Sequence, residues 1–423
     1  MPTALFGFGQ FSFRYLHGLR THGKQTEYVR ERNRIKISME SSMKEKQTGI
    51  KRDANFELLR IVAMIMIVSL HYWGKSNYLD NVTVGTPGFY LAWFIESCCI
   101  PAVNCYVLLT GYFMCEKKFK PGRVIRIWLQ VLEYSVIIYF VCCGFGLDSF
   151  SGPGLLKSFL PVTNETYWFA TKYLLLLFVS PFLNLLLEKC NRVRLTVLCV
   201  CLFTLFSLLP SVFYLKDWLD ISGGYSLLWF VCLYVFGAAV RKTDYSYLRS
   251  KGKCLGGYFA SVFLIFAVKT ILGLVVYRTG EDISYARVLY QYNFVLTLSA
   301  AVFLFGFFKN LKIHSKAAGR IVMFLSPATF GVYLLHLNVY STKWFFRSIL
   351  HPEKISNVWL LFVQYLVVVL AVYLLCTMVE KIRLILLENN PLMRKVFEGA
   401  DRLYEKILKK MLSREEADGK DAS

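Results

Sequence analysis

About ten long apolar runs recur along this chain, and they limit its possible folds more than any other feature. A helix rises about 1.5 Å per residue, so roughly 20 apolar residues cross the hydrocarbon core of a bilayer, which is about 30 Å thick. In lipid such a segment is helical, because a helix satisfies its backbone hydrogen bonds internally. The sequence therefore predicts an all-α, polytopic transmembrane helix bundle. The predicted spans are 56–73, 89–113, 124–146, 167–187, 194–214, 223–240, 254–277, 287–308, 321–340 and 357–379.

The composition excludes an ordinary soluble domain, since 56% of the residues are hydrophobic and only 18% are charged. A formal net charge of +21 could indicate nucleic-acid binding. Here, however, Lys and Arg fall mostly in short clusters within alternate connections between the apolar runs, as the positive-inside rule requires of cytoplasmic loops. We therefore expect a lipid bilayer as the partner, no nucleic acid, and both termini in the cytoplasm. Most of the twelve Cys residues lie inside the apolar runs and are interpreted as small hydrophobic residues.

Three segments follow from this pattern. Residues 1–55 are basic and predict a disordered cytoplasmic tail, residues 56–380 form the membrane domain, and residues 381–423 form a basic, amphipathic cytoplasmic tail. Within the last segment, apolar residues from Val396 to Met411 recur at helical spacing with Lys and Arg between them. This pattern predicts a helix lying on the inner leaflet, with anchoring as its simplest role.

Ionisable residues inside a bilayer are costly, so each one is a candidate for function. Arg60 and His71 lie eleven positions apart in the first span, which returns to nearly the same helix face at about 100° per residue. One stripe therefore carries a guanidinium near the cytoplasmic end and an imidazole deeper in the membrane. The alternatives are an Arg60 that merely reaches the lipid phosphates and a His71 that only bonds to a loop.

A second histidine, His336, lies in the ninth predicted span at a height close to that of His71, counted along both helices. Trp168 and Tyr167, at the outer start of the fourth span, fall near the same level, although interfacial aromatic belts also explain such residues. Neutral imidazoles can accept a proton from a hydroxyl group, so this layer is suited to general-base catalysis.

Arg123 and Arg126 open the third span on the cytoplasmic side and share one helix face, which suits phosphate oxygens. The alternative is ordinary positive-inside charge. Six further polar residues fall within the spans without an assigned partner: Glu96, Asn104, Glu133, Lys172, Lys269 and Asn293.

Four of these segments resemble motifs of the acyltransferase-3 family of integral membrane O-acyltransferases, which acylate sugars of bacterial surface polysaccharides and related acceptors. Arg60 to His71 resembles an arginine, ten residues and a histidine in the first helix. Pro101 to Phe113 resembles a second-helix segment ending in Ser-Gly-Tyr, with Thr110 in place of the serine. Arg123 to Arg126 is similar to an arginine-x-x-arginine motif, and Ser326 to His336 resembles a late helix ending in tyrosine, two apolar residues and histidine.

The resemblance implies transfer of an acyl group, with acetyl the expected one, from cytoplasmic acyl-CoA to a hydroxyl group of a glycan or a lipid-linked sugar at the cell inner membrane. His71 would be the catalytic base, and Arg60 would lie along the path of the pantetheine arm or orient the thioester. Arg123 and Arg126 would hold the donor phosphates. Supporting or acceptor-site roles would fall to His336, Tyr333, Trp168, Tyr167, Asn104 and Ser326.

A thioester is already activated, so no metal is expected. The sequence leaves open the acyl group, the acceptor and the oligomeric state, as well as the choice between direct transfer and an acyl-histidine intermediate. The rival hypothesis is a multi-pass transporter or flippase for a small solute or glycolipid, in which the same polar layer binds the substrate or a proton. A structural subunit of an envelope assembly is a weaker third possibility.

Overall fold

The computed structural model describes residues 53–213, 218–280, 289–338, 350–388 and 390–421, together with residues 342 and 346. Every regular element within these residues is helical. Eight helices in this part of the chain are long and apolar enough to cross a membrane. These findings confirm the predicted polytopic helix bundle. The predicted tail over residues 1–55 lies almost entirely outside the described residues.

The bounds of the eight long segments follow the predicted spans within several residues. They are α2 (Ala54–Lys75), α4 with α5 (Pro87–Cys99 and Ala102–Met114), α6 (Pro121–Gly144), α8 (Trp168–Glu188), α9 with the π-helical η1 and α10 (Arg192–Phe203, Thr204–Leu208 and Leu209–Phe213), α12 (Lys251–Thr279), α15 with η5 and α16 (Lys316–Leu325, Ser326–Ala328 and Thr329–His336), and α18 with the π-helical η8 (Val358–Arg383 and Leu384–Glu388).

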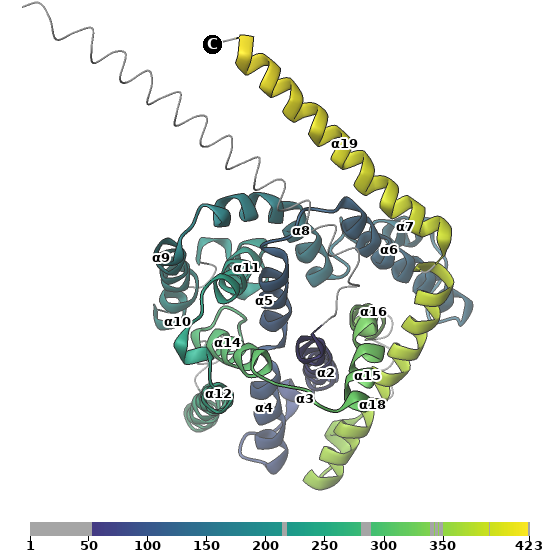
Figure 1. Cartoon of the computed structure of the whole chain (residues 1–423). Coiled ribbons are helices and arrows are strands. Elements are labelled where there is room, and N and C mark those ends of the chain that lie inside the picture. The colour runs from purple at the N-terminus through teal and green to yellow at the C-terminus, as the bar shows by residue number, and fades with distance from the viewer. Residues whose placement is uncertain are drawn as a thin grey trace, which may run out of the picture. The chain divides into compact units, whose positions relative to one another are not determined.

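Helix α2, with the two short helices α11 (Leu227–Lys242) and α14 (Val295–Lys309), forms much of the buried core. α2 contacts α4, α5, α14, α15, α16 and α18, and Figure 1 shows it among these helices. Its Leu59, Ala63 and Val68 are fully buried. The first predicted span is therefore the helix around which the functional residues are arranged.

Two predicted spans are interrupted. The predicted span 89–113 is two helices, because α4 ends before Pro101, whose ring nitrogen carries no hydrogen for the helical ladder. The predicted span 321–340 ends at His336 and contains a 3₁₀ turn over Ser326–Ala328, where Pro327 has the same effect. Hydropathy does not register either break, since the residues on both sides are equally apolar.

α11 and α14 are shorter than the predicted spans 223–240 and 287–308. With 16 and 15 residues they extend only about 24 Å and 22 Å. Each is preceded by non-helical backbone, and the two loops join where Tyr292 N–H donates to the Gly223 carbonyl over 2.9 Å. Irregular backbone at membrane depth is tolerated only where protein buries it or where it lines a cavity. These loops therefore point to a cavity at one end of the bundle.

Helices α5 and α11 pack with their backbones in close approach. A Cβ atom on Gly111 would lie 2.1 Å from the Tyr234 carbonyl oxygen, and one on Gly237 would lie 2.2 Å from the Leu108 carbonyl oxygen. Small residues at helix interfaces permit such packing in membranes. α11 is thereby held as a buried helix of the bundle.

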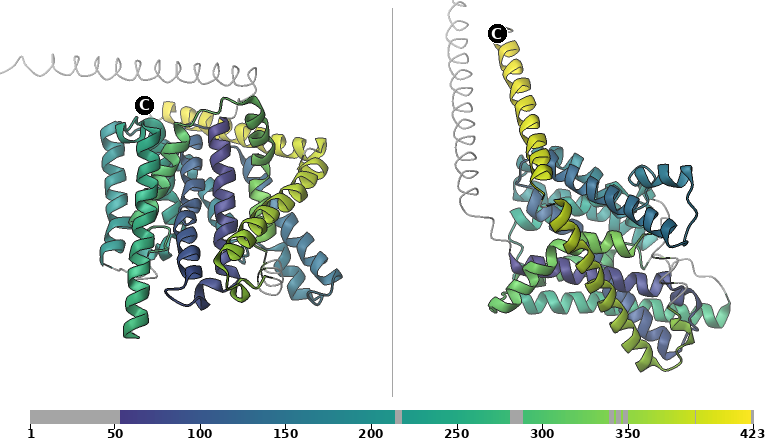
Figure 2. Two further views of the ribbon diagram at one scale, coloured as in Figure 1. Left: turned by 90° about the horizontal axis from the view of Figure 1, so that it is seen from below. Right: turned by 90° about the vertical axis from the view of Figure 1, so that its right-hand side faces the viewer.

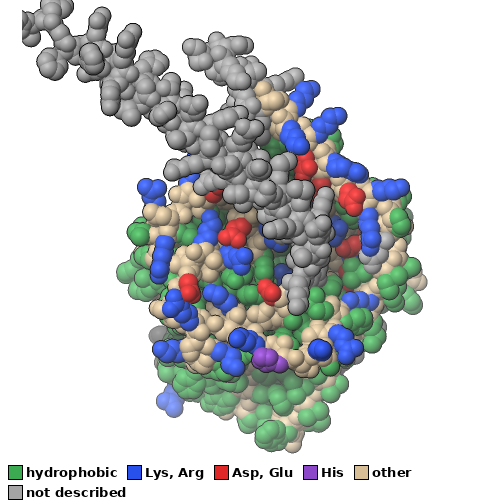
Figure 3. Space-filling model, in the orientation of Figure 1, with side chains coloured by type: hydrophobic (Ala, Val, Ile, Leu, Met, Phe, Trp, Pro, Cys, Tyr) green, Lys and Arg blue, Asp and Glu red, His purple; other side chains and the backbone are tan. Residues whose placement is uncertain are grey.

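After η8 the chain forms α19 (Pro391–Asp421), which packs against α6 and then extends away from the bundle (Figures 1 and 2). The face shown in Figure 3 carries many Lys and Arg side chains and fewer Asp and Glu side chains. This charge distribution is the one that the positive-inside rule expects of a cytoplasmic face, while the exact span count and the side of each terminus stay predictions.

Candidate active site

The two membrane-embedded histidines lie in direct contact. His71 Nδ1 is 2.8 Å from His336 Nε2, and the ring centroids are 5.0 Å apart. His71 is near the end of α2 and His336 is the last residue of α16, so the break at Pro327 sets the direction in which α16 carries His336. The common layer inferred from helical rise is therefore a hydrogen-bonded pair of imidazoles.

The hydrogen bonds of this pair fix which nitrogen can act as a base. His336 Nδ1 is 2.6 Å from the Val332 carbonyl oxygen, which can only accept, so Nδ1 carries the hydrogen. In a neutral imidazole the other nitrogen is then an acceptor, and His71 Nδ1 must donate to it. His71 Nε2 is left with an unprotonated lone pair. The contact with His336 therefore leaves the neutral His71 in the tautomer whose Nε2 could take up a proton.

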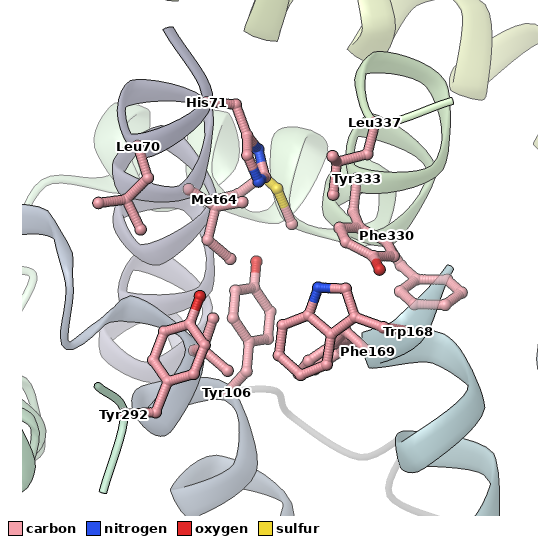
Figure 4. Close-up of a pocket in the computed structure, with 12 residues that line it drawn as sticks. Met64, Leu70, His71, Tyr106, Trp168, Phe169, Tyr292, Phe330, Tyr333 and Leu337 are labelled. Carbon is pink, nitrogen blue, oxygen red and sulfur yellow. The ribbon is translucent and has the colours of Figure 1, made fainter. Parts of the chain in front are cut away.

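His71 lines a narrow, aromatic cavity of about 30 Å³. Figure 4 shows the imidazole near Met64, Tyr106, Trp168 and Tyr333. Space of this size holds about one or two water molecules, so a substrate requires these side chains to move. Tyr106 also links the cavity to the first turns of α2, because its hydroxyl donates to the Arg60 carbonyl over 2.6 Å.

The remaining predicted residues near this layer fall into two groups. Trp168 and Tyr333 line the cavity. Tyr167 and Asn104 instead brace the surrounding backbone and side chains. The Tyr167 hydroxyl accepts from Asn338 over 2.8 Å, while Asn104 donates to the Tyr292 carbonyl over 2.7 Å and accepts from the Trp229 indole over 3.1 Å.

Ser326 lies at the break between α15 and α16. Its carbonyl accepts from the Thr329 hydroxyl over 3.0 Å, and its own buried hydroxyl has no partner within the described part of the chain. The bonded carbonyl stabilises the turn that begins α16. Ser326 therefore supports the helix that carries His336.

Arg60 does not line the His71 cavity. Its guanidinium pairs with Glu57 one helical turn earlier and lies 5.8 Å from the centre of the Phe113 ring. The sequence predicted that Arg60 and His71 share a helix face, but it did not identify Glu57 as the ion-pair partner of Arg60. Arg60 therefore occupies the same helix as His71 but a separate polar environment.

Arg123 and Arg126 also lie outside the lining of this cavity, at the start of α6, where α19 covers them in part. Arg126 pairs with Glu388 over 3.6 Å and lies 5.0 Å from the Phe397 ring centre, yet its side chain stays 49% exposed. Arg123 approaches the Met114 sulfur at 3.4 Å. The two guanidinium groups are accessible to an anion, and no passage from them to His71 is present among the cavity residues.

A buried ionic cluster that the sequence analysis missed connects α6, α16 and α18. Arg383 pairs with Glu380, Glu133 and Glu388 over 2.7–2.9 Å, and Gln130 and Tyr134 also donate to Glu380. The Glu380 carboxylate approaches the backbone of Gly331, where a Cβ would lie 2.3 Å from Oε2. The Glu-x-x-Arg spacing at the end of an apolar run was the available signal.

Glu133, whose partner the sequence left open, forms an ion pair with Arg383 in this cluster. Two other such residues also have neighbours: Lys172 pairs with Glu165 over 2.7 Å, and the Lys269 ammonium lies 3.9 Å from the Trp93 ring centre. Ion pairs and ring contacts thus account for charges that would otherwise favour a transport pathway.

The fold and the site together define a class of protein. An apolar helix bundle buries a hydrogen-bonded pair of imidazoles, one of which lines a cavity, and buried ionisable groups of this kind mark a candidate functional site in a membrane protein.

The family model described as "Acyltransferase domain" matches residues 53–379, which is well over half of the chain. The chain belongs to this acyltransferase-3 family, which confirms the resemblance seen in its motifs, and it is a multi-pass membrane acyltransferase. No curated protein and no solved structure shows a significant match to it.

Proposed function

We propose that this acyltransferase moves an acyl group, with acetyl the expected one, from cytoplasmic acyl-CoA to a hydroxyl group of a glycan or lipid-linked sugar. The observation that carries the proposal is the free lone pair of His71 Nε2, held by the bond from His71 Nδ1 to His336. Location in the inner membrane belongs to the same proposal, because the donor is made in the cytoplasm.

In this mechanism the acceptor oxygen attacks the thioester carbonyl carbon while its proton passes to His71 Nε2. The hydrogen bond from His71 Nδ1 to His336 stabilises the imidazolium that forms. The carbon–sulfur bond then breaks, and the proton passes from His71 to the departing thiolate. The products are an ester and the free thiol of CoA, so every atom and electron pair is accounted for.

The partly exposed guanidinium groups of Arg123 and Arg126 are proposed to hold the donor phosphates, since guanidinium forms paired hydrogen bonds with phosphate oxygens. The donor would then have to extend from the start of α6 toward the cavity of His71. Arg60 lies in the turn of α2 whose carbonyl bonds to the cavity residue Tyr106, which supports a role along that path.

Labelled acetyl-CoA and the purified full-length protein in detergent test the proposal. We expect the wild type to bind the donor and to release free CoA slowly, with water as the acceptor. We expect the double variant Arg123→Ala/Arg126→Ala to bind acetyl-CoA at least tenfold more weakly, because two charge-assisted contacts are lost. Arg278→Ala, at the end of α12, is the matched control.

An unchanged donor affinity in the double variant would remove the arginine assignment. A wild type that neither binds nor hydrolyses acetyl-CoA would favour the transporter hypothesis and would contradict the proposed donor.

The positioning role of His336 gives a separate prediction. His336→Phe keeps a ring of similar size but removes the acceptor for His71 Nδ1–H, so His71 can adopt either tautomer. A group that orients a metal-bound imidazole is typically worth about 10–100-fold, and we take the same order for this pair. We expect such a loss in kcat with little change in the KM for acetyl-CoA, and a smaller loss in His336→Gln, whose amide oxygen can still accept. Equal kcat values for His336→Phe and the wild type would be incompatible with the role.

A further inference from the structure

Three aromatic rings from separate parts of the chain form a continuous cluster near the site. Trp168 begins α8, while Tyr225 and Tyr292 lie in the two loops that precede α11 and α14. The ring centroids are 4.5 Å apart for Trp168 and Tyr225, 4.9 Å for Tyr225 and Tyr292, and 5.8 Å for Trp168 and Tyr292. Rings at these distances are in direct contact, so no cation fits between them. The cluster is a platform rather than an aromatic cage.

The platform belongs to the same cavity as His71. Trp168 and Tyr292 line that cavity, and in the view of Figure 4 both rings lie below the His71 imidazole. Tyr225 extends the platform to the surface, because 45% of this residue is exposed. A ligand resting on the rings could therefore be partly inside the cavity and partly outside the protein.

The loops that hold the two tyrosines are fixed by close backbone contact. Gly224 has a φ of +91°, and a Cβ there would lie 2.7 Å from Tyr292 Cβ. The Asn104 amide holds the Tyr292 carbonyl over 2.7 Å. These contacts keep Tyr225 and Tyr292 in place, and a preorganised surface loses less freedom when it binds a ligand.

A carboxyl group with one buried oxygen atom lies on the helix beside the loop that carries Tyr292. Glu96 is in α4, next to Ser97, whose hydroxyl is 2.8 Å from the Tyr290 hydroxyl in the loop that also carries Tyr292. The Oε2 atom of Glu96 is buried and has no hydrogen-bond partner among the described residues. A buried acceptor without a partner is costly for folding, so this oxygen is a candidate to receive a hydrogen bond from a ligand.

We propose that Trp168, Tyr225, Tyr292 and Glu96 form the acceptor subsite and that its ligand is a pyranose ring. A pyranose has an apolar face of C–H groups, which suits the aromatic platform, and a rim of hydroxyl groups, which suits the Glu96 carboxyl group. Another rim hydroxyl would then approach His71 Nε2. This inference rests on the proposed function and specifies its acceptor site.

Surrogate acceptors test the inference with the full-length protein in detergent and labelled acetyl-CoA. The probes are methyl β-D-glucopyranoside, methyl β-D-galactopyranoside and methyl N-acetyl-β-D-glucosaminide, with glycerol as a hydroxyl compound that has no ring. We expect transfer to at least one pyranoside in preference to glycerol. We expect Tyr225→Leu to raise the KM for that pyranoside about tenfold relative to the KM for acetyl-CoA, and Tyr225→Phe to raise it less. Tyr277→Leu, at an exposed tyrosine in α12, is the matched control.

Glu96→Gln provides a second variant. We expect a higher KM for the pyranoside together with an unchanged midpoint of thermal unfolding, because glutamine has the size of glutamate and Glu96 Oε2 has no hydrogen bond to lose among the described residues. A purely structural role for Glu96 predicts a lower midpoint instead.

The inference is overturned if Tyr225→Leu leaves the KM ratio unchanged, or if the wild type releases CoA from acetyl-CoA but acylates glycerol alone or none of the probes. A wild type that does not act on acetyl-CoA contradicts the proposed function itself. The two failures are therefore distinguishable.

Discussion

Acyl transfer is expected to fall by about 10²–10⁴-fold when His71 is replaced by glutamine, which is the usual contribution of a general base. Glutamine retains a side-chain N–H that can donate to His336 Nε2, so the contact between α2 and α16 is kept. Its amide cannot take up a proton at neutral pH, and the lone pair of His71 Nε2 is lost. The measurement is kcat with labelled acetyl-CoA, using the acceptor identified with the wild type.

His314→Gln is the matched control for this experiment, since His314 is an exposed histidine outside the bundle. Thermal unfolding of both variants shows whether they are folded. A folded His71→Gln protein with near-normal kcat would contradict the assignment of His71 as the base.

Gly111→Ala is expected to destabilise the helix bundle strongly. The added Cβ would lie 2.1 Å from the Tyr234 carbonyl oxygen, and a backbone atom cannot rotate away as a side chain can. Helices α5 and α11 would have to separate, which costs about 3 kcal/mol at the upper end of the usual range for overpacking. The midpoint of thermal unfolding in detergent measures this loss.

Gly256→Ala in α12 is the matched control, because a Cβ at that position has nothing within 4 Å. Alanine favours a helix over glycine by about 1 kcal/mol, so this variant is expected to be unchanged or slightly more stable. Equal midpoints for Gly111→Ala and the wild type would show that the two helices do not pack as closely as described.

The sequence was sufficient to predict the helix bundle and the height of the two histidines, because hydrophobicity and helical rise alone determine both. It did not predict the breaks before Pro101 and at Pro327, where a missing backbone N–H acts inside an unbroken apolar run. The contact between His71 and His336 depends on the second of these breaks. Helical rise alone predicts that the two histidines lie in one layer. It cannot predict that His71 Nδ1 and His336 Nε2 lie 2.8 Å apart.

Residues in loops were also beyond the reach of the sequence. Tyr225 and Tyr292 were not identified, because their positions depend on the meeting of two loops and not on a period. The ionic cluster was missed for another reason: the tenth predicted span ended at residue 379, one residue before Glu380. The family resemblance identified Arg123 and Arg126, but only the structure shows Glu388 and Phe397 of the following segments against Arg126.

The match to the family ends at residue 379, yet the contacts that hold the bundle do not. Arg383 is the common partner of three carboxylates, and Asp401 accepts from the Gly122 N–H at the start of α6 over 2.8 Å. A protein truncated at the family boundary would lose Glu380 and Arg383, which are the partners of Gln130, Tyr134 and Glu133. The segment needed for folding is therefore longer than the matched family domain. A shortened form of the enzyme has to extend at least through Asp401.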